Sequence, residues 1–307
     1  MAINKAFLKA VKAVSFVNID VKSHYKSVRN MWNIAHPFRP DINDGYIFAD
    51  SYVDNVPVRI FCPDNLKQND VIIFIHGGGW VTGNNQSYSG TCSALCRKTG
   101  LKVISVDYSL SPETKFPYAL EECYRVCRDI ALNNDGCNIN AEKIILMGDS
   151  AGGNLCAAVS LMATERGDFF LYKQILLYPV TYSRHDALSP FKSVHIYGSD
   201  YFLTSERMCG YMELYINSDN DRKNPLLAPL LHENPVSQPD TLIITAQYDI
   251  LHDEGTEYGR KLAMHGNKVK TICINDSLHG FITLPEHFDI VKECYRHIKD
   301  FIDETEE

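Results

Sequence analysis

The chain has 307 residues, of which 45% are hydrophobic and 22% charged, and its formal net charge is −8. A chain of this length can bury a sizeable core, and large α/β sheets commonly use such a length as one unit. Nucleic acids and anionic membranes require a basic surface, so we expect neither as a partner of this acidic chain.

The first 45 residues carry helical patterns and no strand pattern. In MAINKAFLKAVKAV the apolar residues fall on one helical face and the lysines lie off it. The segment lacks the uninterrupted apolar stretch of a signal peptide, and no run approaches the ~20 apolar residues of a transmembrane helix. We therefore expect an amphipathic helix packed on the body of a cytoplasmic protein.

Short β-branched and apolar runs predict the strands of one sheet. Two runs, at 46–52 and 56–62, predict an antiparallel hairpin at its edge. Six more are continuous hydrophobic runs, as expected for parallel strands covered on both faces, and they span 71–76, 102–107, 143–148, 174–179, 241–246 and 269–274. Helices are expected between them, at about 87–99, 117–133, 151–166, 254–265 and 286–304. This alternation predicts an α/β fold with a mostly parallel sheet and right-handed crossovers.

Residues 180–230 interrupt the alternation with loop and one helix near 205–217. Insertions into such sheets lie at the loop ends, where active sites also lie. We interpret this insertion and residues 1–45 as one composite helical cap. The cap then covers the site of a catalytic domain that spans residues 46–307.

The ten cysteines are predicted to stay reduced. Their spacing within helices suits small buried hydrophobes, and no C-x-x-C pair or Cys/His cluster has the spacing of a zinc site. Reduced thiols are typical of a cytoplasmic protein. We expect no metal and no other cofactor.

A G-x-S-x-G motif spans residues 148–152, between a predicted strand and the helix that begins at Ala151. Such a strand-to-helix turn holds the serine with its hydroxyl exposed, and the flanking glycines avoid collisions with neighbouring backbone. The N-terminal amides of the helix point toward any oxyanion that forms there. The motif alone is common, but with these flanks it indicates that Ser150 is a nucleophile.

The sequence HGGGW at 76–80 comes directly at the end of a predicted strand. Three consecutive glycines leave backbone N–H groups uncovered, which a loop needs if it is to stabilise a tetrahedral oxyanion. A flexible turn is the alternative interpretation. Because a G-x-S-x-G motif follows downstream, we favour the oxyanion loop.

A serine of ordinary pKa needs a base, and the base needs an acid that orients it. In this fold class the order along the chain is Ser, then Asp or Glu, then His. Asp249 follows the strand at 241–246, and His279 follows the last strand. Order and placement therefore predict a Ser150–His279–Asp249 triad.

Other acidic residues compete for the role of Asp249. Asp253 and Glu254 are expected to cap the following helix, whose exposed N–H groups favour acidic side chains. Asp276 shares the loop of His279, Asp107 has a structural hydrogen-bonding role, and Asp149 points away from the nucleophile across the tight turn.

Five segments together resemble the motif set of one family. They are HGGGW (76–80), DYSLSPETKFP (107–117), GDSAGGNL (148–155), YDILHDEG (248–255) and HGF (279–281). The set resembles that of the hormone-sensitive-lipase-like esterases, the bacterial carboxylesterase and acetyl-esterase branch of the α/β hydrolases. The resemblance runs from about residue 56 to residue 282, and the first 45 residues carry none of its motifs.

The resemblance implies an α/β-hydrolase fold with an eight-stranded sheet and a helical cap. It implies Ser150, Asp249 and His279 as catalytic residues and the amides of Gly77, Gly78 and Ala151 as the oxyanion hole. The expected function is that of a serine carboxylesterase that hydrolyses short-chain acyl esters through an acyl-enzyme. The expected partner is a small-molecule ester, and a homodimer is the one protein association kept open.

Two alternative functions remain at this point. HGGGW also fits the H-G-G-x-W pattern of kynurenine-formamidase-like relatives, so an amidase or arylformamidase on the same site is the first. The second is a non-catalytic small-ligand receptor, since plant gibberellin receptors resemble this family but lack the catalytic histidine. The presence of His279 argues against the receptor.

Overall fold

The computed structural model describes residues 20–36, 45–66, 69–133, 136–137, 139, 141–199 and 201–304. The amphipathic helix expected at the N-terminus lies outside these residues. Within the described part of the chain, every helix is too short or too polar to cross a bilayer.

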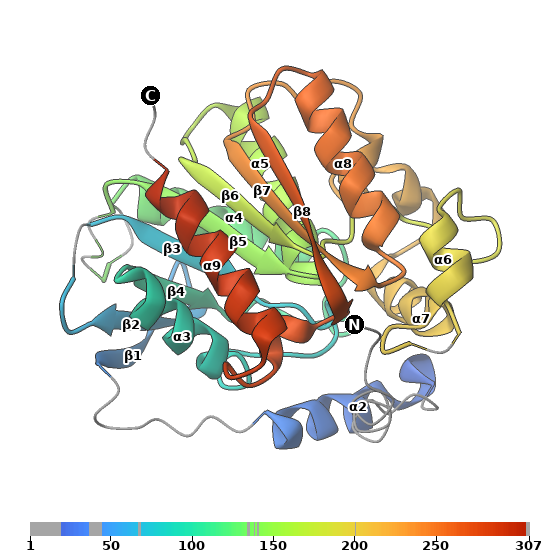
Figure 1. Ribbon diagram of the computed structural model, residues 1–307, viewed down its shortest axis with the longest axis horizontal. Coiled ribbons are helices and arrows are strands. Elements are labelled where there is room, and N and C mark those ends of the chain that lie inside the picture. The colour runs from blue at the N-terminus through green and yellow to red at the C-terminus, as the bar shows by residue number, and fades with distance from the viewer. Residues whose placement is uncertain are drawn as a thin grey trace.

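A single eight-stranded sheet organises the molecule, as the sequence predicts (Figure 1). Its strands are β1 (Tyr46–Val53), β2 (Val56–Pro63), β3 (Val71–Ile75), β4 (Lys102–Val106), β5 (Ile144–Asp149), β6 (Lys173–Leu177), β7 (Asp240–Tyr248) and β8 (Val269–Leu278). They lie in the order β1-β2-β4-β3-β5-β6-β7-β8. The β1–β2 hairpin is antiparallel and joins β4 antiparallel, whereas β4 to β8 run parallel.

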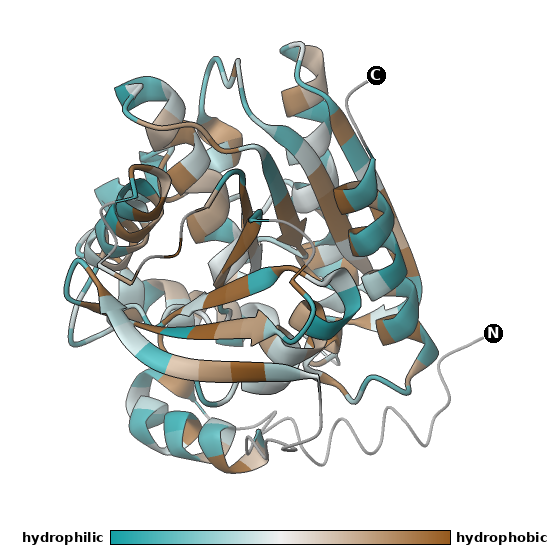
Figure 2. Ribbon diagram, turned by 90° about the vertical axis from the view of Figure 1, so that its left-hand side faces the viewer, coloured by the Kyte–Doolittle hydropathy of each residue, from teal (hydrophilic) through white to brown (hydrophobic). Residues whose placement is uncertain are grey.

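Helices cover both faces of the sheet, so the central strands are buried on both sides. On one face lie α3 (Ser89–Thr99) and α9 (Asp289–Asp303), and on the other lie α4 (Tyr118–Ala131), α5 (Ala151–Arg166) and α8 (His252–Met264). All five residues of β3 and all six of β5 are buried. Figure 2 shows the result, with apolar strands inside and hydrophilic residues on the outer sides of the helices.

Three further helices lie outside these two layers: α2 (Val21–Ala35), α6 (Lys192–Tyr197) and α7 (Ser205–Tyr215). The insertion thus contains a short helix, α6, that the sequence did not predict. α2 lies against α7, where Val21 packs with Tyr211 and Leu214, and Lys22 Nζ lies 2.6 Å from Glu213 Oε2. The two segments interpreted as one cap are therefore in direct contact.

Arg29 joins α2 to the body of the sheet. Its Nε donates to the carbonyl of Val81 at 2.8 Å, and its Nη2 donates to the carbonyl of Ser111 at 2.9 Å. Both carbonyls belong to loops that follow central strands. α2 is thereby held over the carboxyl ends of those strands.

All ten cysteines lie among the described residues, and each is a thiol outside any disulfide. The structure thus places no disulfide between them, and that they stay reduced remains a prediction. Six of them are buried, namely Cys92, Cys96, Cys123, Cys127, Cys156 and Cys294. They pack in the two cores on either side of the sheet.

Candidate active site

Ser150 lies at the turn between β5 and α5, with φ 55° and ψ −118°. A residue with a side chain is strained in this conformation, which holds the serine at the tip of a sharp turn. The neighbouring glycines are required by close backbone approach: a Cβ on Gly152 would lie 2.0 Å from the carbonyl oxygen of Ile75. The predicted strand–turn–helix geometry is therefore present.

The structure brings the three predicted triad residues together. His279 Nε2 lies 2.8 Å from Ser150 Oγ, and His279 Nδ1 lies 2.7 Å from Asp249 Oδ2. The carboxylate accepts the proton on Nδ1, which leaves Nε2 as the acceptor for the serine hydroxyl. All three side chains are buried. This arrangement suits a nucleophile, its general base and the group that orients the base.

Strand ends position both partners of the serine. Asp249 follows the last residue of β7, and its second oxygen, Oδ1, accepts from the backbone N–H of Leu251 at 3.1 Å. His279 follows the last residue of β8, and the ring of Tyr178 meets the imidazole edge-on at 4.9 Å between centroids. The imidazole is thus held from two sides.

The competing acids turn out to hold the cap in place. Asp253 Oδ2 accepts from the backbone N–H of Ser193 in α6 at 2.9 Å. Glu254 is fully buried and accepts from the N–H of Thr181 at 2.8 Å, and it pairs with His185 at the same distance. The prediction that both cap α8 is wrong, because their carboxylates reach the inserted segment instead.

The glycine loop after β3 differs from the prediction at one position. The N–H of Gly77 donates to Asp149 Oδ1 at 2.7 Å, so this amide is already in use. Gly77 is therefore withdrawn as an oxyanion donor. Gly78 and Gly79 line the cavity in front of Ser150, and within the described residues no hydrogen bond uses either amide. Ala151 is the first residue of α5, and its N–H has no acceptor within that helix.

Asp149 is buried beneath this loop. Its carboxylate accepts from Gly77 and from the hydroxyl of Tyr88, which lies 3.1 Å from Oδ2. Burial raises the pKa of Asp149 to about 6, because a charged carboxylate is costly away from water. Both carboxylate oxygens are thus used by Gly77 and Tyr88, so the side chain holds the loop in place.

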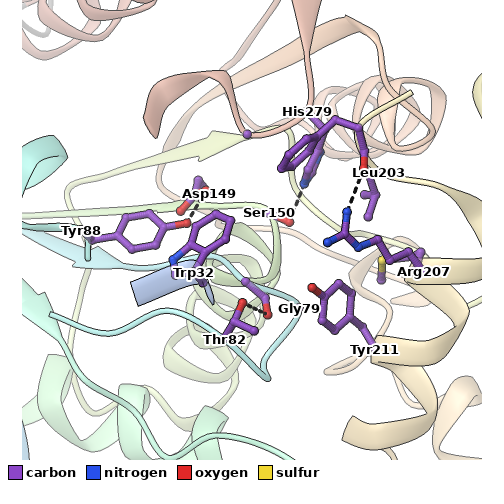
Figure 3. A pocket seen from close by; sticks show the side chains of 14 residues that line it. Trp32, Gly79, Thr82, Tyr88, Asp149, Ser150, Leu203, Arg207, Tyr211 and His279 are labelled. Atoms are coloured by element: carbon purple, nitrogen blue, oxygen red, sulfur yellow. Dashed lines mark hydrogen bonds between the residues drawn. The ribbon is translucent and has the colours of Figure 1, made fainter. Parts of the chain in front are cut away.

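The cavity in front of Ser150 has a volume of about 50 Å³ (Figure 3). A water molecule needs about 10–15 Å³ of such volume, so the cavity holds a group of only a few heavy atoms. Its walls come from the glycine loop, α2, α7 and the loop after β8. The lining residues are Trp32, Gly78, Gly79, Thr82, Tyr88, Asp149, Ser150, Phe202, Leu203, Arg207, Met208, Tyr211, His279 and Gly280.

Sequence reasoning missed several of these residues. Tyr211 and Phe202 are two of several aromatic residues in the insertion at 180–230, but Trp32, Arg207 and Met208 belong to no recognisable motif. Arg207 lies at helical spacing from the apolar residues of α7, where an arginine on the buried face is unusual. In the sequence, only this position of Arg207 on the apolar face of the helix indicates that it lines a cavity. In the described part of the chain, no cluster of His, Cys, Asp or Glu side chains is arranged to hold a metal ion.

Comparison with known proteins identifies the family. Residues 72–283 match the family of the α/β hydrolase fold, which is more than half of the chain. The chain belongs to the α/β hydrolases. Its membership of the hormone-sensitive-lipase-like branch, which the motif set predicts, is confirmed by this match and by the relatives.

Curated relatives and solved structures agree. An arylesterase of Saccharolobus solfataricus is 34% identical over 75% of this chain and 74% of its own. An ethyl acetate hydrolase of Pseudomonas putida is 30% identical over 75% of this chain and 72% of its own. A hyperthermophilic esterase of the archaeon Pyrobaculum calidifontis superposes with a TM-score of 0.87 at 27% identity, over 98% of each chain. These relatives place the chain among carboxylic ester hydrolases.

Proposed function

We propose that this protein is a serine carboxylesterase that hydrolyses short-chain acyl esters through an acyl-enzyme on Ser150. The observation that carries the proposal is the continuous hydrogen-bonded series from Asp249 through His279 to Ser150, which ends in a cavity of about 50 Å³. The esterases among the relatives support the reaction class.

The first half of the reaction forms the acyl-enzyme. His279 Nε2 takes the hydroxyl proton of Ser150 as Oγ attacks the ester carbonyl, and Asp249 stabilises the imidazolium that results. When the tetrahedral intermediate collapses, His279 returns the proton to the departing alcohol oxygen. In the second half, His279 removes a proton from water as the water oxygen attacks the acyl carbonyl. His279 then returns that proton to Ser150 Oγ as the bond to the serine breaks and the carboxylic acid leaves.

The negative oxygen of the tetrahedral intermediate needs fixed donors in a water-poor site. We assign this role to the amides of Gly78, Gly79 and Ala151. The first two line the cavity, and the third opens α5 beside the nucleophile. The positive end of the α5 dipole adds to the stabilisation.

Cavity size sets the expected acyl group. Room for a few heavy atoms suits acyl groups from acetyl to roughly hexanoyl, whose far end reaches the cavity mouth. The insertion of some 50 residues at 180–230 is short for a long lipid-binding groove. Soluble esters are therefore the proposed substrates, and water-insoluble lipids are not.

Replacing Ser150 with alanine tests the proposal. Hydrolysis of phenyl acetate should fall by about 10³–10⁶-fold, while circular dichroism and thermal unfolding stay close to those of the wild type. Ser160 offers a matched control, because it is buried in the same helix and bonds Gln238 away from the cavity. Ser160→Ala should keep its esterase activity. Wild-type activity in a folded Ser150→Ala variant would refute the proposed function.

A further inference from the structure

The cavity holds a cationic side chain that the proposed hydrolysis does not use. Arg207 lies in the first turn of α7, is 9% exposed, and lines the same cavity as Ser150 and His279. In Figure 3 its guanidinium extends from α7 toward these two residues. A short-chain neutral ester has no anionic group with which the guanidinium could pair.

The guanidinium is held in a defined position. Its Nη1 donates to the carbonyl of Phe202 at 3.3 Å, and its Cζ lies 5.8 Å from the centre of the Phe202 ring. The backbone N–H of Arg207 donates to the side chain of Thr204, the residue that caps α7, at 3.2 Å. The bond to Thr204 fixes the backbone of Arg207, and the contacts with Phe202 fix its guanidinium. Together they hold the side chain on the cavity wall.

Tyr211 adds a second polar group on the same side of α7. It lies four residues after Arg207, so the two side chains share one face of the helix. Tyr211 also lines the cavity, and Figure 3 shows its hydroxyl pointing into the same space. Its ring packs on the glycine loop, since a Cβ on Gly79 would lie 2.4 Å from Tyr211 Cγ.

The chemistry of these groups selects the ligand. A guanidinium has five N–H donors and no acceptor, and its planar fork matches the two oxygens of a carboxylate. A phenol donates one further hydrogen bond. The N-terminal end of α7 contributes partial positive charge beside Arg207. In a chain of net charge −8, this wall is locally suited to an anion.

We propose that the substrates carry a carboxylate close to the scissile ester, and that Arg207, assisted by Tyr211, binds this carboxylate. This inference rests on the proposed esterase function and narrows its substrate class. The small cavity requires the carboxylate to lie within a few bonds of the ester group. The carboxylate belongs either to the acyl part, as in a dicarboxylic acid hemiester, or to the alcohol part, as in an acylated hydroxy acid.

Two matched substrate pairs test the proposal and distinguish these sources. Monoethyl succinate against ethyl butyrate places the charge on the acyl part, and acetylsalicylate against phenyl acetate places it on the alcohol part. Acid release in a pH-stat follows all four esters. For the wild type we expect the charged member of at least one pair to show the lower KM, and the pair that does so identifies the source.

Arg207→Met removes the charge and keeps much of the side-chain volume. Relative to the wild type, the ratio of kcat/KM for the charged ester to that for the neutral ester should fall by about 10–100-fold, as expected for loss of a charge-assisted hydrogen bond. Tyr211→Phe should lower the same ratio by less. Arg184→Met is the control, because Arg184 lies in the same insertion, outside the cavity, and pairs with Asp186. Its ratio should stay at the wild-type value.

The outcomes are separable. If the wild type hydrolyses the neutral esters but favours them in both pairs, the proposal about Arg207 is wrong and the esterase function stands. The same holds if Arg207→Met and Arg184→Met change the ratio equally. If the wild type hydrolyses none of the four esters, the proposed function itself fails. The wild-type comparison decides the question even if Arg207→Met does not fold.

Discussion

The N–H of Gly77 donates to Asp149 Oδ1 across 2.7 Å, and this bond joins the glycine loop after β3 to the last residue of β5. Because Ser150 directly follows Asp149, the bond also fixes the loop relative to the nucleophile. The contact leaves no room for a side chain, since a Cβ on Gly77 would lie 2.7 Å from Asp149 Oδ2. The HGGGW and G-x-S-x-G motifs therefore act as one structural unit.

The Asp149 carboxyl should make stability depend on pH. Burial raises its pKa from 3.8 to about 6 in the folded protein. The protonated Asp149 therefore adds fully to the free energy of unfolding below its pKa in the unfolded chain. This stabilisation is lost as the pH rises through its pKa in the folded protein. We compare the wild type with Asp149→Asn, which does not titrate. Between about pH 4 and pH 7, the unfolding free energy of the wild type should fall by ~3 kcal/mol relative to that of the variant.

Urea unfolding at the two pH values measures this difference. Asp289→Asn is the control, because Asp289 is almost fully exposed and its variant should follow the wild type at both values. A constant offset between wild type and Asp149→Asn across this range would show that Asp149 does not titrate as described.

Asp249 and Asp253 lie four residues apart and should respond differently to the same substitution. Asp249→Asn keeps the shape of the side chain but stabilises the wrong tautomer of His279, so turnover should fall by about 10²–10⁴-fold. In Asp253→Asn the amide oxygen still accepts from the N–H of Ser193, so stability should change by less than about 1 kcal/mol and turnover little. Steady-state kinetics and thermal unfolding of both variants check this. The opposite ranking would make Asp253 the catalytic acid.

Gly79 should not tolerate a side chain. Its φ is +62°, and a Cβ would meet the ring of Tyr211 at 2.4 Å. Gly79→Ala must displace either the ring or the loop, so kcat should fall by about 10²-fold, as when one oxyanion donor is lost. Gly90→Ala is the matched control in α3, where a Cβ meets nothing within 4 Å. That variant should keep full activity and gain about 0.5–1 kcal/mol in stability. If Gly79→Ala and Gly90→Ala are equally active, the glycine loop does not stabilise the oxyanion.

Acyl-chain preference should follow the cavity volume. For p-nitrophenyl esters, kcat/KM should be highest between acetyl and butyryl and should decline by ~10-fold or more at octanoyl. Met208 lines the cavity and is 2% exposed, so Met208→Ala should move the optimum toward longer chains. Met264→Ala, at an exposed position, should leave the profile unchanged. A wild-type enzyme that prefers long-chain triglyceride emulsions would contradict the short-chain proposal.

The sheet could be predicted from sequence because its parallel strands are covered on both faces. Their apolar runs are continuous, and each except the run at 174–179, which leads into the insertion, is followed by a recognisable helix. The ends of the strands were harder to predict. β8 continues through Asn275 and Asp276, polar residues that end the apolar run, because Leu278 pairs with Tyr248 beyond an irregularity in β7. Pairing between strands, which no local pattern records, sets this boundary.

The triad positions could likewise be predicted, since Ser150, Asp249 and His279 each follow a strand end in the order that the fold requires. The error at Gly77 has a different origin. Three consecutive glycines look equivalent in sequence, and only the hydrogen bond that Gly77 donates to Asp149 on β5 shows which amide is occupied. Trp32 and Arg207 were missed because the cap helices have no motif that fixes which face meets the cavity.

Trapping the acyl-enzyme tests the central claim most directly. The wild type is mixed with p-nitrophenyl acetate, quenched in acid within the first turnover, digested and analysed by mass spectrometry. We predict one added acetyl group on the peptide that contains Ser150, with a matching burst of p-nitrophenol, and no such peptide from Ser150→Ala. Ester hydrolysis with an acetyl group on a different residue, or at an undiminished rate in Ser150→Ala, would contradict the account.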